Sequence, residues 1–408
     1  MANKKKVLII TQHYWPENFR ITDIAEGMAE KGYLVDVLCG IPNYPTGKYF
    51  RGYGLKSNRR QLRKGVNIIR VPEIPRFLNN NLGIILNYIS FPFFCIFSII
   101  PLLSKKYDRV FSYQLSPVFM TLPAIVYSKL TKVPLYIYVC DFWPHQLFSV
   151  KKITNTFLRK ILTFISYWHY KNAQGVIATF EGIKKQLESD AKIPIHKTIY
   201  IPQAPEKLYE KNIYDKTLNK RFSDTFNIVF AGSLNPAQSF DTLIKAAEIV
   251  NNELKIKIKY VIVGDGMSRK SIENEIKRLK LTNIFEFEGT KKVEDIPKYH
   301  YIADALIVAL LKSDIYEYAI PAKVNSYMAS GKPILGAMDG EAKTLINTKA
   351  KCGICVSSGD YKELAKAIIK IVKMKKHSRD SLGRNGKLYY NKYFERDMNL
   401  NRLIDFVF

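Results

Sequence analysis

Two residues that can exchange protons stand at the end of one apolar run of the chain. Asp141 follows the run LYIYVC (135–140) directly, and His145, which titrates near neutral pH, comes four residues later. At the end of a parallel strand, a carboxylate points into the crevice where open α/β sheets bind ligands. We therefore interpret Asp141 and His145 as candidate acid–base residues. The alternatives are a helix N-cap for Asp141 and an ordinary loop histidine for His145.

Two other places suit the binding of phosphate. Glu17, Asn18 and Arg20 follow the first apolar run, VLIIT (7–11), and arginine is well matched to phosphate geometry. Gly232 ends the apolar run NIVFAG, where a glycine lets a phosphate or a sugar approach the backbone closely. The alternative for Gly232 is an ordinary turn at the end of a strand.

A lysine stands where a helix is expected to begin. Lys323 lies two residues after Pro321 in the motif PAKVNSYMASG, and proline is common at the first position of a helix. The helix macrodipole disfavours a cation there, which favours an anion-binding role over that of a plain surface lysine. Arg269, in the motif GDGMSRK, is the second candidate for the same task.

The elements that position these residues are short apolar runs that alternate with amphipathic stretches. Strands are predicted at 7–11, 34–39, 66–71, 109–113, 135–140, 175–179, 198–201, 227–232, 260–266, 284–289, 304–310, 332–337 and 353–356. This alternation is typical of a parallel, doubly wound sheet. The polar stretch 201–225, which contains two prolines, interrupts the pattern before it restarts.

We expect an α/β protein with two doubly wound, Rossmann-like domains that face each other across a cleft. The predicted parts are an N-terminal domain (1–202), a linker (203–225), a C-terminal domain (226–385) and a last helix (386–408) that crosses back to the first domain. Ligands are expected in the cleft, beyond the carboxyl ends of the strands.

Composition restricts the class of partner. The 408 residues contain 63 Lys and Arg against 36 Asp and Glu, a net charge of +27 that implies a negatively charged partner. Nucleic acid, anionic lipid and a phosphorylated substrate are the candidates. Cys352 and Cys355 have the CxxC spacing but no second pair that could complete a zinc site, so we expect two cysteines on a buried strand.

One segment is unusually apolar for such a protein. No charge occurs from Phe77 to Ser104, a length that could cross a bilayer. The strands predicted on either side of it are expected to be neighbours in one sheet, and strands of one sheet cannot lie on opposite sides of a membrane. Two interpretations remain, a buried crossover helix and a helix at the membrane surface, and Pro92 and Pro101 argue against one long helix.

A second segment mixes positive charge with aromatic residues. The stretch 151–171 contains five basic residues and no acidic one. We therefore expect 82–103 and 151–171 to contact an anionic membrane surface, and we expect no nucleic acid.

Several motifs, taken together, resemble one enzyme family. They are YWPENFRITDIAEGMAEKGYLVDVLCGIPNYPTGKYFRGY (14–53), DFWP (141–144), FAGSLNPAQSFDTLIKAAE (230–248) and IPAKVNSYMASGKPILGA (320–337). With them, the chain resembles the retaining glycosyltransferases of the GT-B fold called family 4. It is most similar to the amino-sugar (L-fucosamine) transferase-like subgroup of bacterial O-antigen and capsule synthesis.

The resemblance implies a reaction. A UDP-sugar donor binds the C-terminal domain, and a lipid-diphosphate-linked sugar binds the N-terminal domain as the acceptor. A glycosyl group, expected to be an N-acetylated amino sugar, is transferred with retention, without a metal or another cofactor. The place of action is the cytoplasmic face of the inner membrane, as a peripheral protein.

The resemblance also assigns donor contacts. In many family members an Arg and a Lys stabilise the leaving diphosphate, at positions that correspond here to Ser233 and Gln238. Both charges are missing, so Lys323 is the expected replacement and Arg269 the second.

Two family glutamates eight residues apart correspond to other residues in this chain. The first falls near Tyr318, with Glu317 beside it as the expected contact to the donor sugar. The second, which holds the ribose hydroxyls, falls on Ser326.

On the acceptor side, Asp141 stands where the family has an acidic residue or a histidine, and either Asp141 or the leaving phosphate takes the acceptor's proton. Glu17, Asn18 and Arg20 are expected to bind the acceptor diphosphate or the donor. Other proteins that stay open are a nucleotide-sugar epimerase of the same fold, and a basic protein that binds membranes or nucleic acid.

Overall fold

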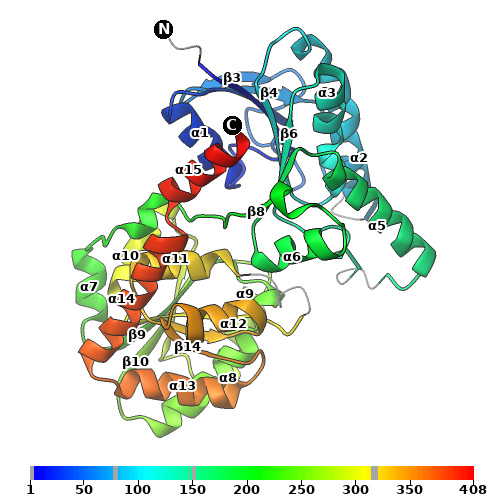
Figure 1. Cartoon of the computed structure of the whole chain (residues 1–408). Helices are drawn as coiled ribbons and strands as arrows, with labels where there is room; N and C mark the ends of the chain where they lie inside the picture. The colour runs from blue at the N-terminus through cyan, green and yellow to red at the C-terminus, as the bar shows by residue number, and fades with distance from the viewer. Residues whose placement is uncertain (1–3, 77–80, 146, 149–152, 314–319) are drawn as a thin grey trace. The chain divides into compact units, whose positions relative to one another are not determined.

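The computed structural model describes residues 4–76, 81–145, 147–148, 153–313 and 320–408, in two compact units (Figure 1). Unit 1 comprises Met1–Gln203 together with Asp397–Phe408, and unit 2 comprises Ala204–Arg396. Each unit is built around its own sheet and is described separately below.

The sheet of unit 1 has eight strands, which are parallel except for one edge strand. The strands are β1 (Lys6–Ile10), β2 (Leu34–Gly40), β3 (Arg60–Arg63), β4 (Val66–Val71), β5 (Arg109–Gln114), β6 (Leu135–Val139), β7 (Gly175–Ala178) and β8 (Thr198–Tyr200). Their order in the sheet is β3-β4-β2-β1-β5-β6-β7-β8, and β3 pairs with β4 in the antiparallel direction. Strand order changes direction around β1, the switch point at which doubly wound sheets bind ligands.

Helices cover both faces of this sheet. They are α1 (Ile21–Glu30), α2 (Asn81–Ser98), α3 (Leu122–Thr131), α5 (Thr156–Lys171), α6 (Glu181–Ser189) and α15 (Arg396–Val407). Successive residues of a strand point to opposite faces. Leu8 and Ile10 pack with α2, α3 and α6, whereas Val7 and Ile9 pack with α1 and α15. The alternation thus builds two hydrophobic layers on one sheet.

The sheet of unit 2 has six parallel strands. They are β9 (Phe226–Ala231), β10 (Ile258–Val263), β11 (Phe285–Gly289), β12 (Ala305–Ala309), β13 (Ile334–Ala337) and β14 (Gly353–Val356). The order is β11-β10-β9-β12-β13-β14, which again changes direction at the first strand of the unit. The carboxyl ends of β9 and β12 therefore flank the expected ligand site of unit 2.

The helices of unit 2 also lie on both faces of its sheet. They are α7 (Lys216–Phe222), α8 (Phe240–Glu253), α9 (Arg269–Arg278), α10 (Ile296–Ile302), α11 (Ala322–Ser330), α12 (Gly340–Thr344), α13 (Tyr361–Lys373) and α14 (Lys376–Tyr393). Helices α8, α9 and α13 contribute to one large core cluster with the strands.

All thirteen predicted strands are present, within a few residues at their ends. Strand β3 was not predicted, because its sequence RQLR is charged and its side chains are largely open to solvent. The expected linker also differs: it contains α7, whose first turn is capped by the Asp215 side chain, which accepts from the amides of Thr217 and Leu218. Both cysteines of the CxxC motif are buried, as expected.

The apolar segment forms a single helix, α2, followed by a short 3-10 turn at Ile100–Leu102. The prediction that Pro92 argues against a long helix was wrong. A proline removes one backbone hydrogen bond, and here it lies inside a buried stripe with Phe91 and Cys95, whose packing holds the helix together. Among the residues that the structure describes, no helix is long and apolar enough to cross a bilayer.

Candidate functional site

The carboxyl edge of the unit 1 sheet gathers residues from five parallel strands. They follow β1 (Gln12, His13, Glu17), β2 (Asn43, Tyr44), β4 (Glu73, Arg76), β5 (Ser116) and β6 (Asp141, His145). The carboxyl ends of parallel strands meet at one edge, so segments far apart in the chain come together here.

Asp141 is partly exposed, and its neighbours hold it in place. Ser116 Oγ donates a hydrogen bond of 2.9 Å to Asp141 Oδ2, and Trp143 Nε1 donates to Ser116 Oγ at 3.1 Å. Gln114 Nε2 donates to the backbone oxygen of Asp141 at 3.0 Å. The carboxylate is thus oriented through a chain of two hydrogen bonds and stays accessible, which suits a general base.

His145 lies near Asp141 in the chain and packs on an aromatic ring. Its imidazole stacks on Phe142 with a centroid distance of 4.8 Å. Burial lowers the pKa of His145 below its usual value. Burial therefore favours the neutral form of this imidazole.

The side chain of Glu17 is directed toward the interior of unit 1. The residue is buried, and its carboxylate accepts from the backbone amides of Asn43 at 2.7 Å and Tyr44 at 2.6 Å. Its other oxygen lies 2.7 Å from His13 Nδ1. Glu17 therefore shapes the loop that follows β2. Of its two predicted companions, Asn18 is exposed at the surface and Arg20 is partly buried at the start of α1.

A network that the sequence analysis missed lies beside Glu17. Glu73 is buried and accepts hydrogen bonds from Gln12 Nε2 at 3.0 Å and from Asn43 Nδ2. Burial, and after it the charge of Glu17, raises the pKa of Glu73 well above its usual value. The sequence offered the same indication as for Asp141: Glu73 is a carboxylate that stands two residues after a predicted strand, 66–71.

The carboxyl edge of unit 2 is built from glycines instead. Gly232 follows β9 with φ of +154°, and Gly264 follows β10 with φ of +136°. A Cβ on Gly264 would lie 1.9 Å from the Gly232 oxygen, and a Cβ on Gly266 would lie 2.3 Å from the Leu234 oxygen. The loops after β9 and β10 therefore approach each other so closely that only glycine fits at these two positions.

Lys323 brings a positive charge to these glycines. Its Nζ donates to Gln238 Oε1 at 2.5 Å, lies 4.0 Å from the centre of the Phe230 ring, and would lie 2.8 Å from a Cβ on Gly232. Desolvation lowers the pKa of Lys323 to about 7. Among the described residues, no carboxylate lies within ion-pair distance of Nζ. The arrangement fits a site for an anion.

Of the other residues predicted to contact the donor, the structure describes Arg269, Ser326 and Ser233. Arg269, the first residue of α9, is paired with Asp265 in the preceding loop at 3.1 Å and with Glu273 in the helix at 2.9 Å. Ser326 is buried, and its hydroxyl donates to the Lys323 carbonyl oxygen at 3.0 Å. Ser233 is exposed just after β9. Glu317 and Tyr318 lie outside the described residues.

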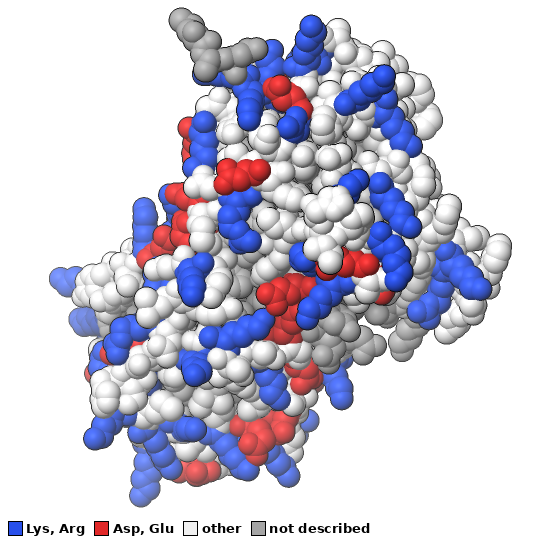
Figure 2. Space-filling model, viewed as in Figure 1, with Lys and Arg blue, Asp and Glu red and all other residues white. Residues whose placement is uncertain are grey.

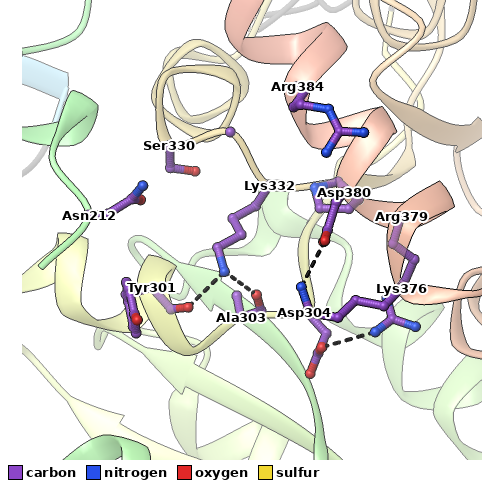
Figure 3. A pocket seen from close by; sticks show the side chains of 12 residues that line it. Asn212, Tyr301, Ala303, Asp304, Ser330, Lys332, Lys376, Arg379, Asp380 and Arg384 are labelled. Carbon is purple, nitrogen blue, oxygen red and sulfur yellow. Dashed lines mark hydrogen bonds and ion pairs between the residues drawn. The ribbon is translucent and has the colours of Figure 1, made fainter. Parts of the chain in front are cut away.

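A cavity of about 340 Å³ lies at the opposite, amino edge of the unit 2 sheet (Figure 3). Its charges largely satisfy each other or the backbone. Lys332 Nζ donates to the carbonyl oxygens of Tyr301 at 2.7 Å and Ala303 at 2.8 Å, and Lys376 pairs with Asp380 at 2.7 Å. This cavity is therefore separate from the candidate site.

Part of the chain is similar in sequence to known glycosyltransferases. Residues 211–389 match the model of the family described as glycosyl transferases group 1. A curated relative, an uncharacterized glycosyltransferase of Methanocaldococcus jannaschii, is 26% identical over 260 residues, which cover 56% of this chain and 60% of that protein.

Solved structures resemble nearly the whole chain. Sucrose-phosphate synthase from Thermosynechococcus elongatus is similar with a TM-score of 0.73 at 15% identity, over 99% of this chain and 98% of its own. HepE from Anabaena, solved in complex with UDP, is similar with a TM-score of 0.72 at 16% identity, over 98% of both chains. At these identities the likeness shows the fold, which is the predicted GT-B architecture of two Rossmann-like units. Residues 211–389 thus match the family model of group 1 glycosyl transferases, within a chain that has the GT-B fold.

Proposed function

We propose that the whole chain is a retaining glycosyltransferase of family 4. It moves an N-acetylated amino sugar from a UDP-sugar to a lipid-diphosphate-linked sugar in capsule or O-antigen synthesis, as in the L-fucosamine transferase-like subgroup. The observation that carries the proposal is Lys323, an ammonium beside Gly232 in a group 1 glycosyltransferase domain, with no carboxylate of the described residues to neutralise it.

The donor's diphosphate is the proposed partner of Lys323. When the bond between the anomeric carbon and the diphosphate oxygen breaks, negative charge develops on the leaving UDP. A cation in a partly desolvated site stabilises that charge far better than one in water. Gln238 and Phe230 hold the ammonium, through a hydrogen bond and a cation–π contact. UDP as the nucleotide is supported by HepE, the similar fold that was solved with UDP.

The acceptor hydroxyl must lose its proton as its oxygen bonds to the anomeric carbon. Asp141 or the leaving phosphate takes this proton, and no metal or other cofactor takes part. The hydrogen bond from Ser116 orients the Asp141 carboxylate at the edge of the sheet where we place the acceptor hydroxyl.

The lipid part of the acceptor fits the surface of unit 1. Along α2 the exposed apolar residues Leu82, Ile85, Ile89, Phe93 and Phe97 recur every three or four positions, and the last four are each 51–58% exposed. Such a stripe at helical spacing, with no charge on it, fits the boundary between lipid headgroups and acyl chains.

Helix α5 offers a second surface of this kind. Phe157 and Phe164 are 73% and 72% exposed, and Arg159 and Lys160 stand between them in the sequence. On the face seen in Figure 2, the end of unit 1 where α5 lies shows Lys and Arg among uncharged residues. Basic residues near an anionic leaflet contribute about 1 kcal/mol each. We infer a peripheral location at the cytoplasmic face of the inner membrane.

The reaction is tested with a panel of UDP-amino sugars and lipid-diphosphate-linked sugars, with products read by mass spectrometry. The expected result is one extended lipid-linked product with the anomeric configuration of the donor. An epimerase would convert the UDP-sugar without any acceptor. No product from any pair would contradict the transferase.

Membrane contact is tested separately, by flotation with vesicles that contain phosphatidylglycerol. Phe93→Asp and Phe164→Asp are each expected to reduce the bound fraction several-fold. The matched control is Leu388→Asp, which changes a 67% exposed leucine on unit 2 and should leave binding unchanged. Equal binding of all variants would remove α2 and α5 from the membrane contact.

A further inference from the structure

The segment that follows β4 is fastened to α2 by two buried polar residues. Asn87 Nδ2 donates to the Ile74 carbonyl oxygen at 2.8 Å, and the Ile74 amide donates to Ser90 Oγ at 2.9 Å. Asn87 and Ser90 lie on the buried side of a helix that is otherwise almost entirely apolar. Both backbone polar groups of Ile74 are thereby satisfied, so the residues after it leave the sheet in a defined direction.

Two positions after Ile74, Arg76 is held on three sides. Its Nε donates to Asn87 Oδ1 at 3.1 Å. The guanidinium lies 5.2 Å from the centre of the Tyr44 ring and 4.9 Å from the centre of the Tyr88 ring. Two aromatic faces and one amide thus fix the plane of the guanidinium before any ligand arrives. Tyr88 also forms a side-chain hydrogen bond with Arg76, and the guanidinium that Asn87 and Tyr88 orient is a group that can bind a phosphate bidentately.

The charge of Arg76 is not balanced by an ion pair. No carboxylate among the described residues lies within 4 Å of it, whereas Arg269 and Arg221 each contact two. Glu73 interacts with Arg76 electrostatically without an ion pair: burial raises the pKa of Glu73, and the charge of Arg76 opposes that rise. A partly buried arginine without a carboxylate is expected to take an external anion.

Arg76 also lies near the candidate base. Burial raises the pKa of Tyr88; the charge of Arg76 opposes this shift and the charge of Asp141 adds to it. Tyr88 is therefore within electrostatic reach of both Arg76 and Asp141. An anion on Arg76 would lie at the same sheet edge as the carboxylate that meets the acceptor hydroxyl.

Helix α2 joins this cation to the apolar stripe. Asn87 and Tyr88 lie between the exposed residues Ile85 and Ile89 in the sequence. One side of α2 is open to solvent, and the other side packs on the sheet. Helix α2 thus presents apolar side chains to solvent and holds the Arg76 guanidinium on its inner side. A lipid-diphosphate ligand has the matching order of groups, with an acyl or prenyl chain followed by phosphate.

We propose that Arg76 binds the phosphate of the lipid-linked acceptor, and that Asn87, Tyr44 and Tyr88 position its guanidinium for this contact. The assignment rests on the proposed function for the identity of the acceptor. It excludes the donor's diphosphate and bulk anionic phospholipid as the main partner of Arg76.

The test compares Arg76→Gln with Arg60→Gln, which removes the same charge from an exposed position of β3. With a lipid-diphosphate-linked acceptor in neutral detergent, Arg76→Gln should raise the acceptor KM about tenfold or more, with the KM of the UDP-sugar unchanged. Arg60→Gln should change neither. A raised donor KM, or weaker flotation with phosphatidylglycerol vesicles, would assign Arg76 to the donor or to bulk lipid and overturn the proposal.

A second measurement works without any transfer. Binding of farnesyl diphosphate to the full chain is measured by calorimetry, with farnesol as the uncharged probe. Arg76→Gln should weaken farnesyl diphosphate and leave farnesol as it is. If this holds while no transfer occurs, the proposed function fails and the Arg76 site stands. If transfer occurs but Arg76→Gln changes neither measurement, the Arg76 site fails.

If Arg76→Gln does not fold, Arg76→Lys is the second variant. It keeps the charge but loses the planar guanidinium that binds phosphate bidentately, so it should show a smaller rise in acceptor KM. No rise with that variant would also overturn the site.

Discussion

The carboxyl edges of the two sheets are built on the same strand arrangement but from different residues. In unit 1 the edge is filled with buried side chains that hydrogen-bond to one another, such as Glu73 with Asn43 and with Gln12. In unit 2 the edge is made of glycines at positive φ with one ammonium beside them. The edge of unit 1 fixes the directions of a few polar side chains. The edge of unit 2 would let a bound polyanion come close to the backbone and to the ammonium of Lys323.

This difference suggests a division of labour. Side-chain networks suit the positioning of a base and of a phosphate-binding arginine, because each member is held by two or more partners. A glycine-lined edge suits a diphosphate, because the absence of Cβ atoms lets the ligand come close. Four substitutions test this division, ordered by the size of the effect we expect.

Asp141→Asn should have the largest effect. It keeps the shape of the side chain but cannot accept the proton, so kcat should fall about 10²- to 10⁴-fold. UDP affinity, measured by calorimetry, should not change. A loss in kcat below about tenfold would assign the proton to the leaving phosphate.

Gly264→Ala should strongly destabilise unit 2. Its Cβ would lie 1.9 Å from the Gly232 oxygen, so the two loops must move apart. We expect a loss of about 3 kcal/mol or more in the free energy of unfolding, measured in urea. The matched control is Gly359→Ala: Gly359 has φ of +79° and no atom within 4 Å of the added Cβ. That variant should lose about 1–2 kcal/mol. Similar losses for both would show that the contact between the loops is unimportant.

Lys323→Met should weaken UDP binding about 10- to 100-fold at pH 7, because a charge-assisted contact is lost. The wild-type pKa of about 7 adds a pH dependence. Above that pH the free lysine is mostly neutral, so binding of UDP must take up a proton. Affinity should therefore fall as pH rises from 7 to 9, by up to about tenfold per unit. Calorimetry in buffers with different ionisation enthalpies measures the proton uptake, and Lys323→Met should show none in this range.

Ser116→Ala should have the smallest effect. It removes the hydrogen bond of 2.9 Å that orients Asp141 but leaves the carboxylate in place. One such bond corresponds to about a three- to tenfold loss in kcat. A loss as large as that of Asp141→Asn would mean that Ser116 itself takes part in the proton transfer.

Much of the fold was predictable from local pattern. The apolar runs at 7–11 and 227–232 are flanked by amphipathic stretches, and this alternation has few solutions other than a doubly wound sheet. Strand β3 escaped prediction because an edge strand is stabilised by its pairing with β4 rather than by burial of its own side chains. Helix α7 was not predicted because it lies in the polar stretch 201–225, whose two prolines and many charges resemble a linker, and only the Asp215 cap marks its start.

The site was predictable as a set of positions rather than as a set of contacts. Asp141 could be placed because it follows a strand, and Lys323 because a lysine at a helix start is costly. Glu17 follows a strand as well, yet its carboxylate turns inward to two backbone amides, a choice that depends on the loop after β2. Arg76 gave no signal, since nothing in its own sequence neighbourhood shows that Tyr44 and Tyr88 would lie on either side of it.

By itself, the sequence determined the alternation of strands and helices, the excess of positive charge and the uncharged, apolar length of α2, because these depend only on residue types and their spacing. The tertiary structure decided which residues meet. Lys323 reaches Gln238 across 85 positions, and Gln12 reaches Glu73 across 61. Such contacts depend on the order and register of the strands, which bring the ends of distant segments to one edge, and no local periodicity encodes that order.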